Sequence, residues 1–167
     1  MKLETKRLIL RRPQAEDADD YLEFCNTEFV LRYNAMMPRT KAQVQKAFSQ
    51  PREDLLLLQH KQSGKVIGEI SIGEDSLRWG VESRELSYFL REDFSRQGYM
   101  KEALQAVLEH LFTRENMECV SARCFAPNEA SLALLKSLNF HQDGYIPRCV
   151  KGYQDRIFDD TLHSLFR

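Results

Sequence analysis

The most regular pattern of apolar and polar positions runs from about residue 98 to residue 113. Its apolar side chains recur every three or four residues and form one stripe: Met100, Ala103, Leu104, Val107, Leu108 and Leu111. Polar residues such as Lys101, Glu102 and Glu109 fall mostly outside that stripe. This spacing predicts an amphipathic helix whose apolar face packs on the rest of the protein.

Other segments show either helical spacing or the features of strands. Helices are expected at residues 15–25, 40–48 and 129–138, the second of them capped by Thr40. Apolar or alternating runs predict strands at residues 6–11, 55–60, 66–72, 85–90, 119–125, 143–150 and 157–166. In the strand at 85–90, the period of two puts one set of side chains on one face (Leu86, Tyr88, Leu90) and the other set opposite (Glu85, Ser87, Phe89).

The elements follow one another as strand, two helices, three strands, helix, strand, helix and two strands. This order predicts an α+β fold with three layers, in which a mixed sheet carries helices on both faces. No repeat, low-complexity tract or linker interrupts the chain. We therefore expect one domain over residues 1–167, a length that suffices to bury a core.

Charge and composition argue against several classes of protein. The formal net charge is −1, so no basic surface for nucleic acid is expected. No apolar run approaches the roughly 20 residues that a membrane span requires, and the first residues lack the apolar core of a signal peptide. We expect a cytoplasmic protein that binds neither nucleic acid nor membrane. The cysteines and histidines lack metal-ligand spacing, so no metal site is expected.

A single glycine, Gly98, stands at the start of the long predicted helix. The amides of a helix start are unpaired and lie at the positive end of the helix dipole. Glycine lets a phosphate approach the backbone closely, and Arg96 and Lys101 add positive charge nearby. These features fit a site for an anionic, extended cofactor, although a simple turn before a helix explains Gly98 equally well.

A second pattern surrounds the predicted helix at 129–138. Asn128 is a favourable N-cap, and Ser131 occupies the third position of the helix. Asn139 follows the helix where a left-handed conformation is expected, and Phe140 should then pack back onto the helix. Taken singly, each of these residues has a structural explanation.

Together, the two patterns resemble the cofactor signature of the GNAT superfamily of N-acetyltransferases. That signature is Gln/Arg-x-x-Gly-x-Gly/Ala at the start of a long helix, followed about thirty residues later by Asn-x-x-Ser/Ala and then by Gly-Phe. Here Gly98 precedes Asn128 by thirty residues and Ser131 is in place. Asn139 and Phe140 stand where Gly-Phe is expected.

The resemblance extends over nearly the whole chain. Residues 85–90 resemble the strand that ends before the pyrophosphate loop. The opening LETKRLILR of residues 3–11 is similar to the Thr-x-Arg-Leu-x-Leu-Arg of one branch, which includes the ribosomal-protein N-terminal alanine and serine acetyltransferases. The resemblance implies a mostly antiparallel sheet flanked by helices, with a splayed pair of strands at the acyl-CoA site.

Four positions depart from the family pattern. Ser95 replaces Gln or Arg, Arg96 replaces a glycine, and Met100 replaces the final small residue. Leu135 stands where many members carry a tyrosine that protonates the thiolate. Backbone contacts to phosphate tolerate such changes, whereas crowding by Met100 would weaken the binding of the cofactor.

The resemblance implies direct acetyl transfer from acetyl-CoA to an amine, without a covalent enzyme intermediate or a metal. The residues that it assigns to the cofactor are Tyr88, Phe89, Leu90, Arg96, Gln97, Gly98, Tyr99, Met100, Lys101, Asn128 and Ser131. Backbone amides around residues 88–90 would stabilise the oxyanion. Asn128 would bind the pantetheine arm. Ser131 would donate to the sulfur, or else face a neighbouring backbone group, with Tyr145 and Tyr153 as alternative hydroxyls.

Glu85 is the candidate general base, acting through water, although a solvated strand glutamate is an equal alternative. We expect the acceptor pocket to be formed by residues 26–39, the loop that carries Trp79, and residues 151–155. A protein N-terminal α-amine is the leading acceptor, and a small amine such as a polyamine, an amino sugar or an antibiotic is second. A non-catalytic acyl-CoA-binding module is the alternative from another class. The sequence is compatible with either a monomer or a homodimer.

Overall fold

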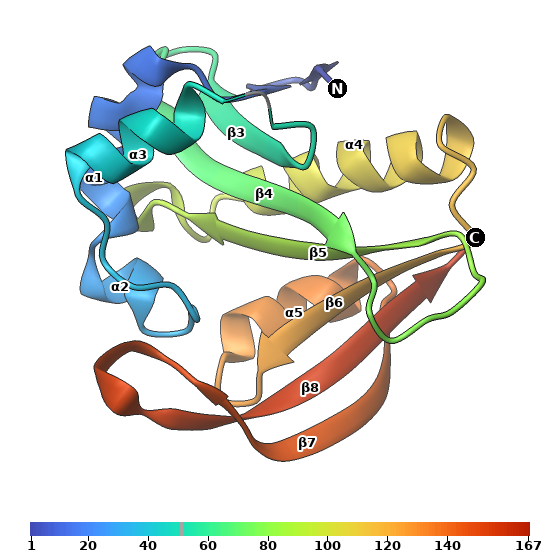
Figure 1. Ribbon diagram of the computed structural model, residues 1–167. Helices are drawn as coiled ribbons and strands as arrows, with labels where there is room; N and C mark the ends of the chain where they lie inside the picture. Colours follow the sequence, from blue (N-terminus) through green and yellow to red (C-terminus); the bar gives the residue numbers. More distant parts are fainter. Residues whose placement is uncertain (51) are drawn as a thin grey trace.

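The strands expected from the sequence form a single sheet. In the computed structural model, which describes residues 1–50 and 52–167, the strand order is β1-β2-β3-β4-β5-β6-β8-β7 (Figure 1). The strands are β1 Leu3–Glu4, β2 Leu8–Arg11, β3 Leu55–His60, β4 Val66–Glu74, β5 Ser83–Leu90, β6 Cys119–Phe125, β7 His141–Lys151 and β8 Ile157–Phe166. Neighbouring strands are antiparallel, except that β5 and β6 run parallel. The sheet is therefore mixed and mostly antiparallel, as expected.

The helices agree with the expected ones and add a short one. The α-helices of the described residues are α1 Ala18–Cys25, α2 Glu28–Leu31, α3 Lys41–Phe48, α4 Tyr99–Thr113 and α5 Glu129–Ser137. Single 3₁₀ turns lie at Ala15–Asp17, Glu92–Phe94 and Tyr153–Asp155. Thr40 caps α3 as expected, and its hydroxyl accepts the N–H of Gln43. The sequence did not reveal α2, because four residues are too few to show helical periodicity.

The helices cover both faces of the sheet, and β3 shows why. This strand has four consecutive leucines, which alternate between two cores. Leu56 and Leu58 pack with residues of α4 and α5, whereas Leu55 and Leu57 pack with residues of α1 and α3. Figure 1 shows α4 and α5 behind the sheet and α1 and α3 beside its other face. The predicted three-layer α+β arrangement is confirmed.

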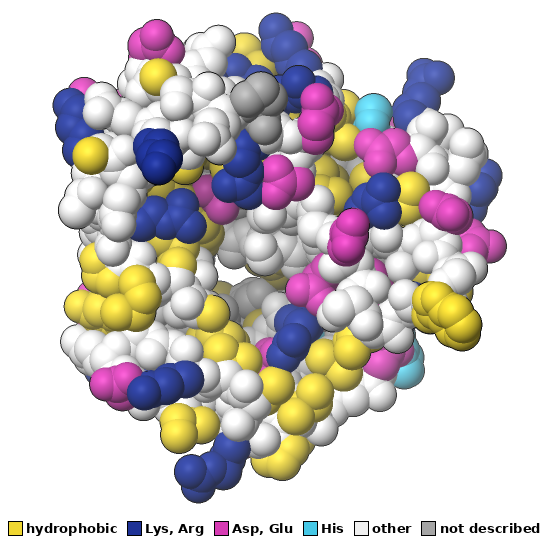
Figure 2. All heavy atoms as spheres, viewed as in Figure 1, with side chains coloured by type: hydrophobic (Ala, Val, Ile, Leu, Met, Phe, Trp, Pro, Cys, Tyr) yellow, Lys and Arg dark blue, Asp and Glu magenta, His cyan; other side chains and the backbone are white. Residues whose placement is uncertain are grey.

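The parallel strands β5 and β6 separate halfway along their length. Their pairing begins at Ser83↔Cys119 and ends at Leu86↔Ala122. Strand β5 continues to Leu90, where it is paired only with β4. The last four residues of β5 therefore have an open backbone edge toward β6, which is the splayed pair that the resemblance implied. Figure 2 shows that this side of the molecule is deeply hollowed.

Hydrogen bonding to β4 shows which amides of β5 face this gap. Just beyond the strand, the N–H of Arg91 donates to the carbonyl oxygen of Ile67 at 2.8 Å, in continuation of the β4–β5 register. Antiparallel strands alternate hydrogen-bonded and non-hydrogen-bonded pairs. The amide of Phe89 therefore also points to β4. The amides of Tyr88 and Leu90 point the other way, into the gap.

The segment that precedes β2 is fastened to the first turn of α4. One carboxylate oxygen of Glu102 accepts the hydroxyl of Thr5 at 2.6 Å and the N–H of Arg7 at 2.8 Å. Its other oxygen accepts Nε of Arg7 at 2.6 Å. Thr5 and Arg7 of the opening Thr-x-Arg-Leu pattern thus hold the start of α4, which follows Gly98.

We expect Glu102→Gln to lower the free energy of unfolding by about 1–2 kcal/mol at neutral pH, because it removes charge-assisted hydrogen bonds. Burial opposes ionisation, but the bonds from Thr5 and Arg7 outweigh it and lower the pKa of Glu102 from 4.5. A lowered pKa contributes stability above the unfolded value, and that stability is lost as the pH falls through the folded value.

The difference between wild type and Glu102→Gln should therefore vanish in acid, as measured by urea denaturation at neutral and strongly acidic pH. Glu109→Gln on the exposed side of the same helix is the control and should change little. An equal loss for both variants, or a loss that persists in acid, would contradict the role of the Glu102 carboxylate.

Candidate active site

The start of α4 presents unpaired amides. Gly98 is the N-cap with φ of 79°, and Arg96 is also left-handed with φ of 57°. The first helical bond runs from the N–H of Glu102 to the carbonyl of Gly98 at 3.0 Å. No side chain caps the helix, so the amides of residues 99–101 remain available at the positive end of a fifteen-residue helix. This arrangement suits a phosphate group.

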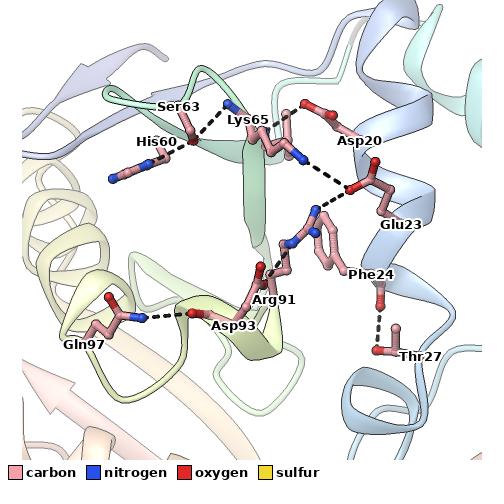
Figure 3. A network of polar contacts seen from close by, with 11 residues as sticks. Asp20, Glu23, Phe24, Thr27, His60, Ser63, Lys65, Arg91, Asp93 and Gln97 are labelled. Atoms are coloured by element: carbon pink, nitrogen blue, oxygen red, sulfur yellow. Dashed lines mark hydrogen bonds and ion pairs between the residues drawn. The ribbon is translucent and has the colours of Figure 1, made fainter.

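The loop that leads into α4 is held from two sides, and Figure 3 shows the contacts on the side of Arg91, Asp93 and Gln97. Nη1 of Arg7 donates to the carbonyl of Gln97 at 2.9 Å, and the Gln97 amide donates to the carbonyl of Asp93 at 2.8 Å. Arg91 pairs with Asp93 at 2.9 Å and with Glu23 of α1 at 2.7 Å. The side chain of Gln97 therefore fixes the loop, and the backbone conformation at the helix start is set by the protein itself.

The first side chains of α4 point into the protein rather than toward a ligand. Met100 is buried in the core between the sheet and α4. Tyr99 is also buried, and its hydroxyl contacts Nε2 of His60 at 3.2 Å. Met100 therefore does not crowd the helix start, in contrast to the effect considered from the sequence. Arg96 is exposed and Lys101 partly so, which leaves both near the unpaired amides.

The start of α5 carries a pair of hydroxyl groups. Asn128 caps the helix, its side-chain oxygen accepting the N–H of Ser131 at 3.3 Å. The hydroxyl of Ser131 lies 2.8 Å from the hydroxyl of Tyr88 on β5. Within the described residues, the hydroxyl of Ser131 therefore faces the side chain of Tyr88 rather than a neighbouring backbone group. Burial raises the pKa of Tyr88, so its phenol stays protonated and can donate.

The gap between β5 and β6 opens into a cleft of about 610 Å³. Its floor consists of polar strand residues on the face that carries α1 and α3: Glu69, Ser71, Glu85, Ser87, Arg123 and Asp160. Tyr33, Met36 and Arg39 form part of its wall. Phe89 lines it with its side chain, as do Tyr88, Asn128 and Ser131 at the cofactor side. One cavity thus joins the expected acyl site to the expected acceptor site.

The walls of this cleft only partly match the expected loops. The segment 33–39 contributes, as expected. Trp79 does not line the cleft, because its side chain is 99% exposed at the surface. Cys149 and Val150 of β7 line it in place of residues 151–155. Tyr145 is exposed and bonded to Asp159, and Tyr153 is likewise outside the cleft lining. The two alternative hydroxyls are therefore remote from Ser131.

Glu85 lies on the floor of the cleft with its carboxyl half-buried. Burial raises the pKa of Glu85 above 4.5, and the charge of Arg123 opposes this effect. The nearby carboxylates Asp75 and Asp160 raise the pKa further. A carboxylate with a raised pKa is a better proton acceptor than a solvated one. Its environment favours the general-base alternative over that of a solvated strand glutamate.

Glu69 was not singled out from the sequence, although it is the one charged residue in the apolar run of residues 66–72. Its carboxylate lies on the cleft floor and accepts the hydroxyl of Tyr21 at 2.7 Å. Burial raises the pKa of Glu69, whereas Tyr21, Arg39 and Arg52 act to lower it. A charge placed in a buried strand was the signal that could have identified it.

The described residues contain no cluster of three or more side chains suited to hold a metal ion. Within the same part of the chain, no helix has the length and apolar character needed to cross a membrane. The four cysteines are free thiols.

Comparisons with known proteins agree with this geometry. Residues 7–141 match the family model described as acetyltransferase (GNAT) domain. The chain belongs to the GNAT family and is an N-acetyltransferase. It is 27% identical to the uncharacterized N-acetyltransferase p20 of Bacillus licheniformis, over 99% of this chain and 96% of that protein.

Solved structures show the same fold. The ribosomal-protein-S5-alanine acetyltransferase of Vibrio fischeri superposes with a TM-score of 0.87 at 18% identity, covering 99% of this chain and 96% of that one. RimL, a ribosomal L7/L12 α-N-protein acetyltransferase solved with coenzyme A, superposes with a TM-score of 0.83 at 17% identity, covering 99% and 98%.

Proposed function

We propose that this chain acts as a single catalytic domain that binds acetyl-CoA in the gap between β5 and β6 and acetylates an amine in a ternary complex. One observation carries the proposal: the open edge of β5 borders the cleft that holds Glu85, and the chain runs on from this strand to the unpaired amides at the start of α4. The diphosphate of the cofactor would bind the amides of α4, its extended pantetheine arm would follow the edge of β5, and its thioester would lie in the cleft.

The cofactor fits residues that the protein already holds in place. The amides of residues 98–101 would bind the diphosphate, and the side chains of Arg96 and Lys101 would add positive charge. The amides of Tyr88 and Leu90 would bond the pantetheine arm and the acyl oxygen. Phe89 contributes its side chain, since its amide is directed to β4. Gln97, Tyr99 and Met100 contribute backbone rather than side-chain contacts.

Two groups of this chain handle protons on either side of the acyl site. Acetyl-CoA supplies an activated thioester when it is bound. Glu85 removes a proton from the incoming amine, directly or through water. The hydroxyl pair of Ser131 and Tyr88 would hold a proton for the departing thiolate, the role of the tyrosine that Leu135 replaces. Asn128 both caps α5 and borders the thioester end of the cleft.

For the acceptor we propose a protein N-terminal α-amine. Such an amine has a pKa of about 7.7–8, whereas a lysine side chain has one of about 10.4, so a partly buried carboxylate suffices for the former. The opening motif and the structural likeness to ribosomal-protein acetyltransferases support this acceptor. A small amine is the second candidate, because a cleft of about 610 Å³ lies in the size range of small-molecule sites.

The test is acetyl transfer to a peptide with a free N-terminus and an internal lysine, read by mass spectrometry. We expect acetylation at the α-amine, and none when the N-terminus is blocked. Small amines are assayed in parallel by release of the CoA thiol. Turnover of small amines alone would move the second candidate to first place. Calorimetric binding of acetyl-CoA without turnover of any amine would favour a non-catalytic module.

We expect Ser131→Ala and Tyr88→Phe each to lower kcat by roughly 10- to 100-fold, since each interrupts the same proton path. The double variant should be little worse than the single ones, because the two hydroxyls act as a unit. Steady-state kinetics measures this, and calorimetry should show nearly unchanged acetyl-CoA affinity. Ser137→Ala on the exposed side of α5 is the control. Additive losses of kcat in the double variant would show that the two hydroxyls act independently.

A further inference from the structure

The charged side chains of the cleft form two groups. One group contains Glu85 on β5 with Arg123 and Asp160 on β6 and β8. The other contains Glu69 on β4 with Arg39 and Arg52. Glu69 pairs in register with Phe89, four residues beyond Glu85 along β5. At about 3.3 Å per residue, the two glutamates are separated by roughly 13 Å along the strands.

The group around Glu85 presents negative charge to the cleft. Arg123 pairs with Asp160: its Nε and Nη2 lie 2.8 and 2.7 Å from the same carboxylate oxygen, and Nη2 also contacts Sγ of Cys149 at 3.0 Å. The other oxygen of Asp160 has no hydrogen-bond partner among the residues that the structure describes, although Asp160 is only 1% exposed. One arginine therefore faces two carboxylates, Glu85 and Asp160. This end of the cleft suits the positively charged or hydrogen-bond-donating amine of an acceptor.

In the group around Arg39, two arginines line the cleft with the single carboxylate of Glu69. Arg52 is paired with Asp54 through two bonds of 3.0 and 2.8 Å. Glu69 is bonded to Tyr21, and its pKa is raised by burial. Arg39 makes no ion pair with any residue that the structure describes, although it is partly buried in the cleft wall. An arginine in this position is a ready binding group for a carboxylate or a phosphate.

The backbone of Arg39 is also fixed in advance. Its carbonyl accepts the side-chain amide of Asn26 at 2.8 Å, and its N–H donates to the side-chain oxygen of Asn26 at 2.9 Å. The next residue, Thr40, caps α3. Because the main chain is held on both sides, little ordering of the loop is needed for the guanidinium to bind a ligand.

We propose that the acceptor carries an anionic group, a carboxylate or a phosphate, which Arg39 binds while the amine lies between Glu85 and Asp160. This inference rests on the proposed acetyl transfer and adds the chemical class of the acceptor. Two sources supply such a group: an acidic side chain within the first three residues of a peptide, or the anion of a small amine. The separation of the two charged groups fits a peptide acid at the second or third residue.

The experiment compares matched acceptors with wild type, Arg39→Gln and Arg39→Lys. One pair is two peptides that differ only by Asp or Asn at the second and third residues. The other pair is 2-aminoethyl phosphate and ethanolamine. We expect wild type to prefer the acidic member of at least one pair on the order of tenfold in kcat/KM, as one charge-assisted hydrogen bond would give. Arg39→Gln should lose the preference, and Arg39→Lys should retain part of it.

Arg32→Gln removes the same charge from an exposed position on the neighbouring turn and should keep the preference. Calorimetric binding of the same acceptors measures the anion site without chemistry. A binding preference without turnover would overturn the proposed function and leave the anion site intact. Equal binding and equal turnover of both members in both pairs would overturn the anion site while leaving acetyl transfer intact. The pair of acceptors that shows the preference identifies whether the anionic group belongs to a peptide or to a small amine.

Discussion

Replacing Glu85 by Gln should lower kcat/KM by roughly 100-fold at mildly acidic pH and by progressively less as the pH rises. At low pH the acceptor amine carries a proton that the carboxylate has to remove. At high pH the amine is already neutral, so the base is needed less. Burial raises the pKa of Glu85 above 4.5, so the wild-type rate should begin to rise above the ordinary carboxyl range. A pH profile of kcat/KM for both proteins measures this.

Two controls separate the loss of a base from damage to the site. Calorimetry should give nearly the same acetyl-CoA affinity for Glu85→Gln and wild type, because Glu85 lies on the acceptor side of the cleft floor. Glu82→Gln removes an exposed carboxylate just before the same strand and should leave the profile unchanged. Wild-type rates for Glu85→Gln at every pH would exclude Glu85 as the base and direct attention to Glu69.

Replacing Gly98 by Ala should weaken CoA binding by roughly tenfold or more while destabilising the fold by only about 1 kcal/mol. The backbone at Gly98 has φ of 79°, a conformation that costs an L-residue about 1–2 kcal/mol. A Cβ atom there would meet only Nη2 of Arg7, at 3.5 Å, so there is room for it. The larger effect should be on the ligand, because relief of the strain turns the amides of the first helical turn away from the phosphate.

Gly80→Ala is a closely matched control. Its φ of 72° imposes similar strain, nothing lies within 4 Å of the added Cβ, and it is in the surface loop between β4 and β5. Thermal denaturation should show similar losses for both variants, and calorimetry should show weaker CoA binding only for Gly98→Ala. Binding of pantetheine, which lacks the diphosphate, should be the same for both. Unchanged CoA affinity in Gly98→Ala would exclude a role of this turn in binding the phosphate groups.

Local patterns in the sequence predicted most of the elements. The apolar stripe in α4 follows from the spacing of residues along one helix. The cap at Thr40 and the left-handed Asn139, with φ of 64°, each depend on a few neighbouring residues. The order of helices and strands predicted helices on both faces of the sheet, and the leucines of β3 pack into a core on each face. The short helix α2 was not predicted, because its four residues are too few to repeat a helical period.

The acceptor side of the site was predicted less well, because it is assembled from distant residues. Trp79 was expected at the cleft but is almost fully exposed, and Leu77 and Arg78 of the same loop line a separate pocket that shares Glu85 with the cleft. Cys149 and Val150 of β7 line the cleft instead, although β8 separates β7 from β6 in the sheet. No local pattern in the sequence predicts that order of strands.

The sequence alone determined most of the helices and strands, the helices on both faces of the sheet and the start of α4 after Gly98, because each follows from residues close together in the chain or from the order of the elements. Only the tertiary structure decided which side chains meet. Arg7 reaches Glu102 across 95 residues, and Tyr88 reaches Ser131 across 43. Such contacts follow from the strand order and from the separation of β5 and β6, which place distant segments around one cleft.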